Sequence, residues 1–271
     1  MMYSYRNERP LIGYINAGGR GTRLKGLLTA DPQKGIAKAL IELGEPKIKL
    51  LDHHIANLRL QGIDDIVVAA GDQSVVAEYT RDEYSKDRAI MVTTSEVQLG
   101  TGGDLVRFAQ SLDASRGLVV QNVDTILDIN IPNFHDVFLL QQKIGAIVSI
   151  ALTKKRGVPN EDAYSVNHQG RVLVSNEFEQ PEPENFATEV CYKASSTGAV
   201  IVDSEFIGSL EWMMDGGVLS LYKDCLARAC CLRGLFAYDN GNRFFRDVGT
   251  IASWKVSQGD VDLQKQLRYN H

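Results

Sequence analysis

The stretch INAGGRGTRL, residues 15–24, has the most informative spacing in the chain. It follows the apolar run Leu11 to Ile15, which is typical of a buried strand. Three glycines within four positions predict a loop with almost no side chains, so backbone N–H groups can approach phosphate oxygens. Arg20 and Arg23 add fixed positive charge in a planar fork that suits phosphate. The stretch therefore predicts a polyphosphate cradle at the carboxyl end of the first strand of an α/β sheet.

Two common phosphate-binding loops do not fit this spacing. The dinucleotide fingerprint G-x-G-x-x-G needs glycine at position 24, where the chain has Leu24, and the P-loop ending G-K-[ST] is absent. A dinucleotide-binding dehydrogenase is therefore disfavoured. The plainest alternative is a glycine turn before a surface loop, but two arginines in a bare glycine loop favour a binding role.

Composition excludes several classes of protein. The 271 residues carry a net charge of -5 with 44% hydrophobic residues, which suits one α/β domain with a sizeable core and argues against a nucleic-acid partner. No apolar run approaches the ~20 residues of a membrane span, so no membrane partner is expected. The first residues, MMYSYRNERP, lack the apolar core of a signal peptide. Four cysteines without a C-x-x-C pair suggest reduced thiols, and we expect a cytoplasmic protein.

Apolar runs and helical patterns alternate along the chain. The strand that ends near residue 15, a helical pattern over 48–60 and a strand over 63–71 predict a right-handed βαβ unit. Further core strands are expected at 118–125, 145–152, 170–174, 195–202 and 235–238, with helices over 131–142 and 219–231.

A second glycine-rich stretch, SEVQLGTGGDL, occupies residues 95–105. Bare backbone donors and acceptors can read the edge of a flat base, and glycine removes the obstacle to close approach. An ordinary helix start capped by Thr101 is the alternative. Asp124 ends an apolar run at the expected carboxyl edge of the sheet, where either a site or a turn residue is plausible.

The run AGGRGTRL at 17–24 and the run LGTGG at 99–103 resemble the signature loops of the sugar-1-phosphate nucleotidylyltransferases, also called NDP-sugar pyrophosphorylases. The FFRDVGT run at 244–250 is similar to the family's end motif. The resemblance is strong over 12–130 and 235–255 and weaker between them. It implies a Rossmann-like, GT-A-like fold: a three-layer α/β/α domain with a mixed, mostly parallel sheet.

This resemblance also implies a division of residues 1–271, which we expect to form a single nucleotidyltransferase domain. Residues 1–130 would be the nucleotide-binding half, and residues 131–271 would carry the sugar site and a second metal ligand. The heptose-1-phosphate guanylyltransferases look most similar, which gives a lean toward GTP, although CTP, dTTP and UTP enzymes share the motifs.

Roles for single residues follow from the matching positions. Asp124 and Asp247 would hold Mg²⁺, and Arg23, Lys38 and Asp124 would be catalytic. The nucleotide would contact Ala17, Gly18, Gly19, Gly21, Thr22, Leu99, Gly100 and Thr101. The sugar would contact Gly103, Glu179, Thr197 and Gly198.

Some positions leave alternatives open. Lys34 competes with Lys38 for the lysine that stabilises phosphate charge, and Glu179 is equally well read as a surface residue of an acidic run. Departures from the family's pattern stand at Ala37, Val123, Ser165 and Gln180. The implied reaction joins an NTP and a sugar 1-phosphate into an NDP-sugar and pyrophosphate. A non-catalytic nucleotide- or sugar-binding regulator, or a cytidylyltransferase for a non-sugar phosphate, are the competing hypotheses, and a homo-oligomer is compatible with the sequence.

Overall fold

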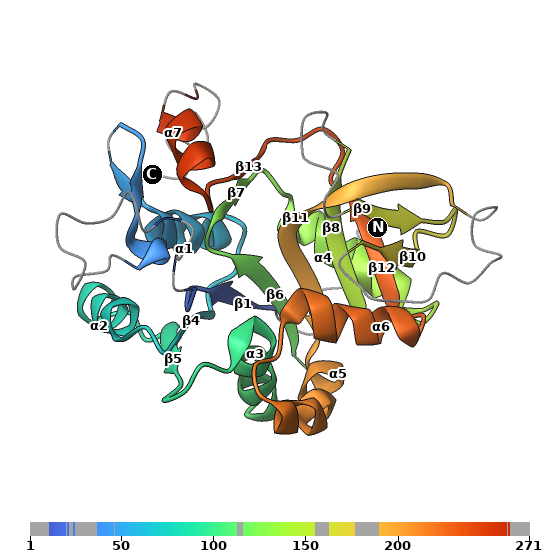
Figure 1. Cartoon of the computed structure of the whole chain (residues 1–271), viewed down its shortest axis with the longest axis horizontal. Helices are drawn as coiled ribbons and strands as arrows, with labels where there is room; N and C mark the ends of the chain where they lie inside the picture. The colour runs from blue at the N-terminus through green and yellow to red at the C-terminus, as the bar shows by residue number, and fades with distance from the viewer. Residues whose placement is uncertain are drawn as a thin grey trace, which may run out of the picture.

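A nine-stranded sheet forms the centre of the computed structural model, which describes residues 11–19, 21, 24, 37–45, 47–112, 116–154, 163–176, 190–258 and 260 (Figure 1). The strand order is β10-β9-β11-β6-β1-β4-β5, with β8 beside β11 and β12 beside β8. The strands are β1 (Leu11–Asn16), β4 (Ile66–Gly71), β5 (Ile90–Thr94), β6 (Gly117–Asn122), β8 (Val148–Thr153), β9 (Ala163–Val166), β10 (Val172–Ser175), β11 (Tyr192–Asp203) and β12 (Leu235–Asp239).

One half of the sheet is parallel. β1 lies between β4 and β6, with Asn16 opposite Ala69 on one side and opposite Asn122 on the other. β5 is parallel to β4, whereas β11 runs antiparallel to β6, β8 and β9. The sheet is therefore mixed, as predicted. Because β1, β4 and β6 share one direction, their carboxyl ends meet at one edge.

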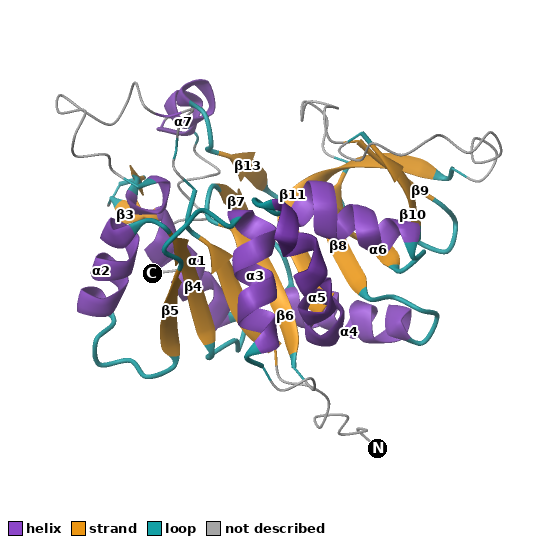
Figure 2. Ribbon diagram, turned by 60° about the horizontal axis from the view of Figure 1, so that its bottom comes forward, coloured by secondary structure: helices purple, strands orange, loops and turns teal. Residues whose placement is uncertain are grey.

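Helices cover both faces of the sheet and complete the predicted three layers (Figure 2). One face is covered by α1 (Leu50–Leu60), α2 (Ser74–Glu83) and α4 (Ile131–Gln142), and the other by α3 (Gly100–Gln110), α5 (Ser204–Gly208) and α6 (Ala227–Cys231). Alternation along β1 explains the two cores, since Ile15 packs in the first and Tyr14 in the second. Among the described helices, each is too short or too polar to cross a bilayer.

Shorter elements gather at the carboxyl edge. They are η2 (Lys38–Leu40), β2 (Glu42–Leu43), β3 (Ile48–Lys49), β7 (Thr125–Leu127), β13 (Phe245–Asp247) and α7 (Ile251–Gln258). β13 pairs antiparallel with β7, and Asp247 lies opposite Thr125. This pairing brings two segments more than a hundred residues apart in the sequence to the end of β6.

The segment between β11 and β12 differs from its prediction. Instead of one helix over 219–231, the chain forms a π-helix, η6 (Leu221–Leu226), that continues into α6, and it is preceded by α5 and the 3₁₀-helix η5 (Ser209–Gly216). Backbone hydrogen bonds join Leu219 to the start of α3. The start of this helix is therefore fixed by tertiary contacts, which the local hydrophobic pattern does not report.

Candidate active site

The first glycine loop leaves β1 at the carboxyl edge. Ala17 donates its N–H to the carbonyl of Ala69 (2.9 Å), and Gly18 follows. A Cβ at Gly18 would lie 3.0 Å from the carbonyl oxygen of Ala70, so the missing side chain allows the loop to pack closely on β4. A Cβ at Gly19 would meet nothing within 4 Å, which leaves one side of the loop open.

Several predicted residues of the site lie outside the described part of the chain. They are Arg20, Thr22, Arg23, Lys34, Glu179 and Gln180. Their proposed roles stay predictions.

The second glycine loop is fixed to the segment that begins η6. The N–H groups of Gly102 and Gly103 both donate to the carbonyl of Leu219, at 2.9 and 3.3 Å, and the Leu219 N–H donates to the carbonyl of Leu99 at 2.8 Å. Gly100 has a φ of +79°, and a Cβ there would overlap the Leu219 carbonyl oxygen. The Leu-Gly-Thr backbone is therefore held in one position, as backbone recognition of a base would require.

Two side-chain details of this loop bear on the predicted contacts. The Thr101 hydroxyl accepts the N–H of Leu221 at 3.1 Å, so this hydroxyl joins α3 to η6. A Cβ at Gly103 would lie 2.9 Å from the Cβ of Leu99, with Met214 and Leu219 next nearest. Gly103 thus packs within the protein, and its contact with a sugar stays a prediction.

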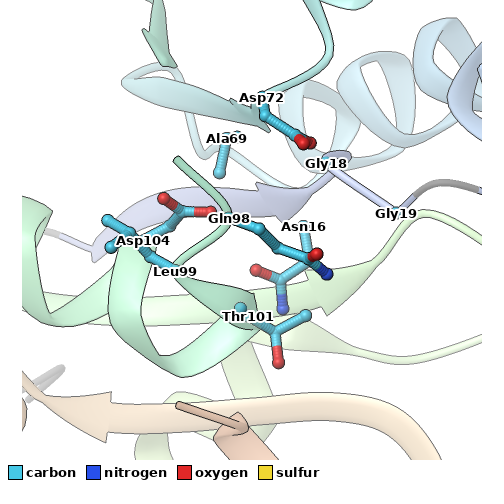
Figure 3. A pocket seen from close by; sticks show the side chains of 11 residues that line it. Asn16, Gly18, Gly19, Ala69, Asp72, Gln98, Leu99, Thr101 and Asp104 are labelled. Carbon is cyan, nitrogen blue, oxygen red and sulfur yellow. The ribbon is translucent and has the colours of Figure 1, made fainter. Parts of the chain in front are cut away.

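The two glycine loops enclose a pocket (Figure 3). Its lining consists of Asn16, Gly18, Gly19, Ala69, Gly71, Asp72, Gln98, Leu99, Gly100, Thr101 and Asp104. Asn16 is oriented by a hydrogen-bond chain, in which its amide donates to Asn122 (3.3 Å) and Asn122 donates to the Tyr222 hydroxyl (3.2 Å). The sequence motifs give no prediction for the polar residues Asn16, Asp72, Gln98 and Asp104, although each immediately follows or flanks a predicted strand end or glycine loop.

Two carboxylates lie in this pocket. Burial raises the pKa of Asp104, the nearby Asp72 raises it further, and Ser95 and Arg107 oppose the shift without cancelling it. Asp104 therefore lies in a place that disfavours its charge unless a ligand or a proton compensates.

Lys38, Asp124 and Asp247 converge beyond the end of β6. The Lys38 ammonium forms an ion pair with Asp124, and their side chains are only 11% and 16% exposed. A Cβ at Gly249 would lie 2.7 Å from Oδ2 of Asp124, 2.8 Å from Oδ1 of Asp247 and 3.1 Å from Nζ of Lys38. Three groups predicted from separate motifs are thus placed around one glycine.

Backbone hydrogen bonds fix this acidic centre. The Gly249 N–H donates to Oδ1 of Asp247 at 2.5 Å, and the Val248 N–H donates to the carbonyl of Asp124 at 2.9 Å. Among the described residues, no group of three metal-binding side chains occurs. Two carboxylates converging on a space that a Cβ would fill nevertheless suit Mg²⁺, since this ion usually takes one or two protein carboxylates, with waters and substrate phosphates completing the shell.

A buried polar pair underlies the turn that carries Asp124. Nδ1 of His54, on α1, lies 3.1 Å from Oε1 of Gln121, on β6, and both residues are buried. Burial lowers the pKa of His54, although Gln121 and the nearby Asp124 oppose this shift. The ring is therefore part of the packing beneath the acidic centre.

One departure from the family's pattern and two of the predicted sugar contacts can now be located. Val123 is buried in the core under α1, so its side chain does not enter the pocket. Gly198 has a φ of +79°, and a Cβ there would lie 2.8 Å from the Thr125 hydroxyl, next to Asp124. The Thr197 hydroxyl donates to the carbonyl of Ala151 at 2.9 Å, so its hydrogen is already used within the sheet. The sugar contacts of Thr197 and Gly198 stay predictions.

Replacing Gly249 by alanine should disrupt the acidic centre more than the fold. Its φ is not in the left-handed region, so the harm comes from the new methyl group, which would press on both aspartates and on Lys38. We expect a loss of about 10²-fold or more in kcat, because catalytic carboxylates displaced by about 1 Å lose that much. Activity measured against Mg²⁺ concentration, with urea unfolding alongside, checks this.

The matched control is Gly208→Ala. Gly208 lies in α5, and its added Cβ would meet only ordinary contacts at 3.8–3.9 Å. This variant should keep its activity and gain up to about 1 kcal/mol of stability. Equal activity losses in both variants would show that the space at Gly249 is not specific to the site.

Comparison with known proteins gives a match to one family model and several solved structures that share the fold. Residues 13–132 match the model of the MobA-like NTP transferase domain. HddC from Yersinia pseudotuberculosis is 18% identical, with a TM-score of 0.64 over 91% of this chain and 97% of HddC, and another HddC structure contains GMP-PN. The inositol-1-phosphate CTP transferase from T. maritima is 13% identical, with a TM-score of 0.68 over 97% and 96% of the two chains.

A Bacillus anthracis protein described as a glucose-1-phosphate thymidylyltransferase, solved with a sucrose, is 17% identical and has a TM-score of 0.70. The match covers 95% of this chain and 99% of that one. No curated protein sequence matches the chain. At these identities the solved structures show a shared fold, and the predicted fold class is confirmed.

Proposed function

We propose that this chain, a nucleotidyltransferase with a MobA-like NTP transferase domain at residues 13–132, converts an NTP and a sugar 1-phosphate into an NDP-sugar and pyrophosphate. The observation that supports this most is the convergence of Lys38, Asp124 and Asp247 around Gly249. This centre lies at the same sheet edge as the pocket between the two glycine loops. One region thus combines a place for a nucleotide with the charges that a phosphate transfer needs.

The chemistry asks for positioning and charge neutralisation. A sugar-phosphate oxygen attacks the α-phosphorus in line with the departing pyrophosphate, and this nucleophile is already an anion, so no general base is required. Lys38 would stabilise the α-phosphate and the incoming phosphate. Arg23, with the N–H groups of residues 19–22, would hold the β- and γ-phosphates as they leave.

Asp124 and Asp247 would hold Mg²⁺ between them. Bound there, the ion would neutralise phosphate oxygens in the transition state. Lys38 already contacts the Asp124 carboxylate, so the ammonium group and the proposed metal site are immediate neighbours. Gly249 leaves the room that this crowded centre needs.

The two halves of the chain would divide the substrates. Residues 1–130 would bind the nucleotide, with GTP favoured, and residues 131–271 would bind the sugar through Thr197, Gly198 and Glu179. Gly198 is close to Thr125 and so to Asp124, which suits a sugar phosphate approaching from the β11 side. We propose that the reaction takes place in the cytoplasm and that the chain assembles as a homo-oligomer.

A second candidate is cytidylyl transfer to a non-sugar or cyclitol phosphate. The likeness to an inositol-1-phosphate CTP transferase over nearly the full chain favours including it. The departures from the family's pattern at Ser165 and Gln180 fall in the half of the sequence that would bind the sugar, where the acceptor would differ.

The test is pyrophosphate release with Mg²⁺. ATP, CTP, GTP, UTP and dTTP are each paired with a panel of sugar 1-phosphates and inositol 1-phosphate, and the Asp124→Ala protein serves as the blank. Turnover of one sugar pair supports the proposal, whereas turnover of CTP with inositol phosphate alone supports the second candidate. Nucleotide binding without turnover on any acceptor would contradict both and indicate a binding role.

A further inference from the structure

We propose that Asp104 selects the base of the nucleotide, and that the selected base is guanine. This inference rests on the proposed function, because it assumes that the pocket between the glycine loops receives the base. It assigns a specificity role to a residue outside the signature motifs.

Asp104 lies in the first turns of α3, directly after the second glycine loop, and its side chain reaches back toward the first. Its Oδ2 lies 3.2 Å from the position that a Cβ on Gly71 would take, and Gly18 is next nearest to that position. Gly71 and Gly18 have no side chains to cover the carboxylate. Figure 3 shows Asp104 in the wall of the pocket that Gln98 and Asn16 also line.

The charge on Asp104 is poorly compensated by the protein. The Asp104 carboxyl group is half-buried. Ser95 and Arg107 stabilise its charged form, whereas Asp72 destabilises it. Buried carboxylates are stabilised by N–H donors, and charge-assisted pairs are stronger than neutral ones. A ligand that brings two N–H donors to Asp104 would therefore stabilise the carboxylate charge that the protein leaves poorly compensated.

Guanine fits this need better than the other bases. Its N1–H and N2 amino group are adjacent donors that a carboxylate accepts as a bidentate pair, and its O6 can accept from an amide such as that of Gln98. Uracil and thymine have one N–H between two carbonyl groups, and the carbonyl oxygens would be repelled by the carboxylate oxygens. Adenine and cytosine set their amino group beside a ring nitrogen that is itself an acceptor. The sequence and the pocket therefore favour GTP.

Asp72 is the natural comparison, because it is an acid in the same pocket. It lies in the turn after β4, and its Oδ1 already accepts the amide of Gln73 at 2.9 Å. We therefore assign base selection to Asp104 and treat Asp72→Asn as the matched control.

The experiment compares GTP with two analogues that differ at C2 of the purine. ITP lacks the amino group, and XTP carries a carbonyl there. Wild-type protein should prefer GTP over ITP by about 10-fold or more in kcat/KM, since a hydrogen bond to a charged group contributes about 1.5–3 kcal/mol. In Asp104→Asn this preference should vanish. The ratio of kcat/KM for XTP to kcat/KM for GTP should rise by about 10-fold. The asparagine amide can donate to the C2 carbonyl of XTP and still accept a hydrogen bond from its N1–H.

If Asp104 had a purely structural role, Asp104→Asn would lower kcat/KM for every nucleotide alike, and the kcat/KM ratio of XTP to GTP would not rise. Asp72→Asn should leave both ratios as in the wild type. Equal use of GTP and ITP by the wild type, or ratios unchanged in Asp104→Asn, would overturn the assignment.

Equilibrium binding of the same three nucleotides separates this inference from the proposed function. If no acceptor is turned over but the GTP, ITP and XTP affinities follow the expected pattern, the base assignment stands and the reaction fails. If the protein does turn over an acceptor but the GTP-to-ITP and XTP-to-GTP ratios are the same in Asp104→Asn as in the wild type, the reaction stands and the base assignment fails. An absence of nucleotide binding overturns both.

Discussion

Replacing Asp124 by alanine should reduce pyrophosphate release by about 10³-fold or more, because one charged group aimed at the transition state contributes about 10²–10³ and Asp124 would also help to hold the metal. The carboxylate is the shared partner of Lys38 and of the space at Gly249. Adding Mg²⁺ in excess should not restore the rate, since one of two ligands is gone. Initial rates over a range of Mg²⁺ concentrations measure this.

The fold of this variant has to be followed separately. Removing one partner of a largely buried ion pair leaves the Lys38 ammonium without compensation, which costs about 3–5 kcal/mol. Asp124→Asn keeps the shape and a hydrogen-bond acceptor, so it should lose as much activity with a smaller loss in urea midpoint. Rates near those of the wild type in Asp124→Asn would refute a charge-based role.

Asp128→Ala is the matched surface control. Asp128 lies four residues further along, in an exposed ion pair with Arg243 at 3.4 Å, where both side chains are more than 40% exposed. Exposed pairs contribute about 0–1 kcal/mol. We therefore expect Asp128→Ala to lose no more than this in free energy of unfolding and to keep its turnover rate unchanged.

Short-range patterns in the sequence predict much of this fold. The helix over 131–142 is found at those residues, since Asn130 caps it and its apolar face packs on the sheet. The nucleotidyltransferase assignment, made from AGGRGTRL and LGTGG, is confirmed by the family match over residues 13–132. The loop assignment succeeds because a bare glycine loop after a buried strand has few other uses.

Local sequence patterns do not predict the contacts between segments that are far apart in the sequence. Nothing local predicts that β13 pairs with β7, and this pairing is what places Asp247 opposite Thr125, beside Asp124. Nor does the motif LGTGG show that the N–H groups of Gly102 and Gly103 donate to the Leu219 carbonyl, which changes where the helix predicted over 219–231 begins. Local sequence patterns show Asp104 only as part of a helix start, because its position near Gly71 depends on how two loops meet.

Replacing Lys38 by methionine should lower kcat by about 10²–10³-fold, since the variant keeps an apolar stem of similar length but loses the ammonium group. The same change should lower the Mg²⁺ concentration needed for half-maximal rate. Lys38 neutralises Asp124 in the structure, and without it the full carboxylate charge is available to the metal. A fall in kcat together with tighter use of Mg²⁺ is therefore the expected signature.

Lys34→Met provides the comparison that decides which lysine acts. The sequence left Lys34 and Lys38 as competitors, and the contact of Lys38 with Asp124 favours Lys38. We expect a much smaller loss of kcat in Lys34→Met and no change in its Mg²⁺ dependence. The reverse ranking would transfer the phosphate-stabilising role to Lys34 and reduce Lys38 to a counter-charge for Asp124. In that case Lys38→Met should still destabilise the protein, because the carboxylate would then be the buried charge left without its partner.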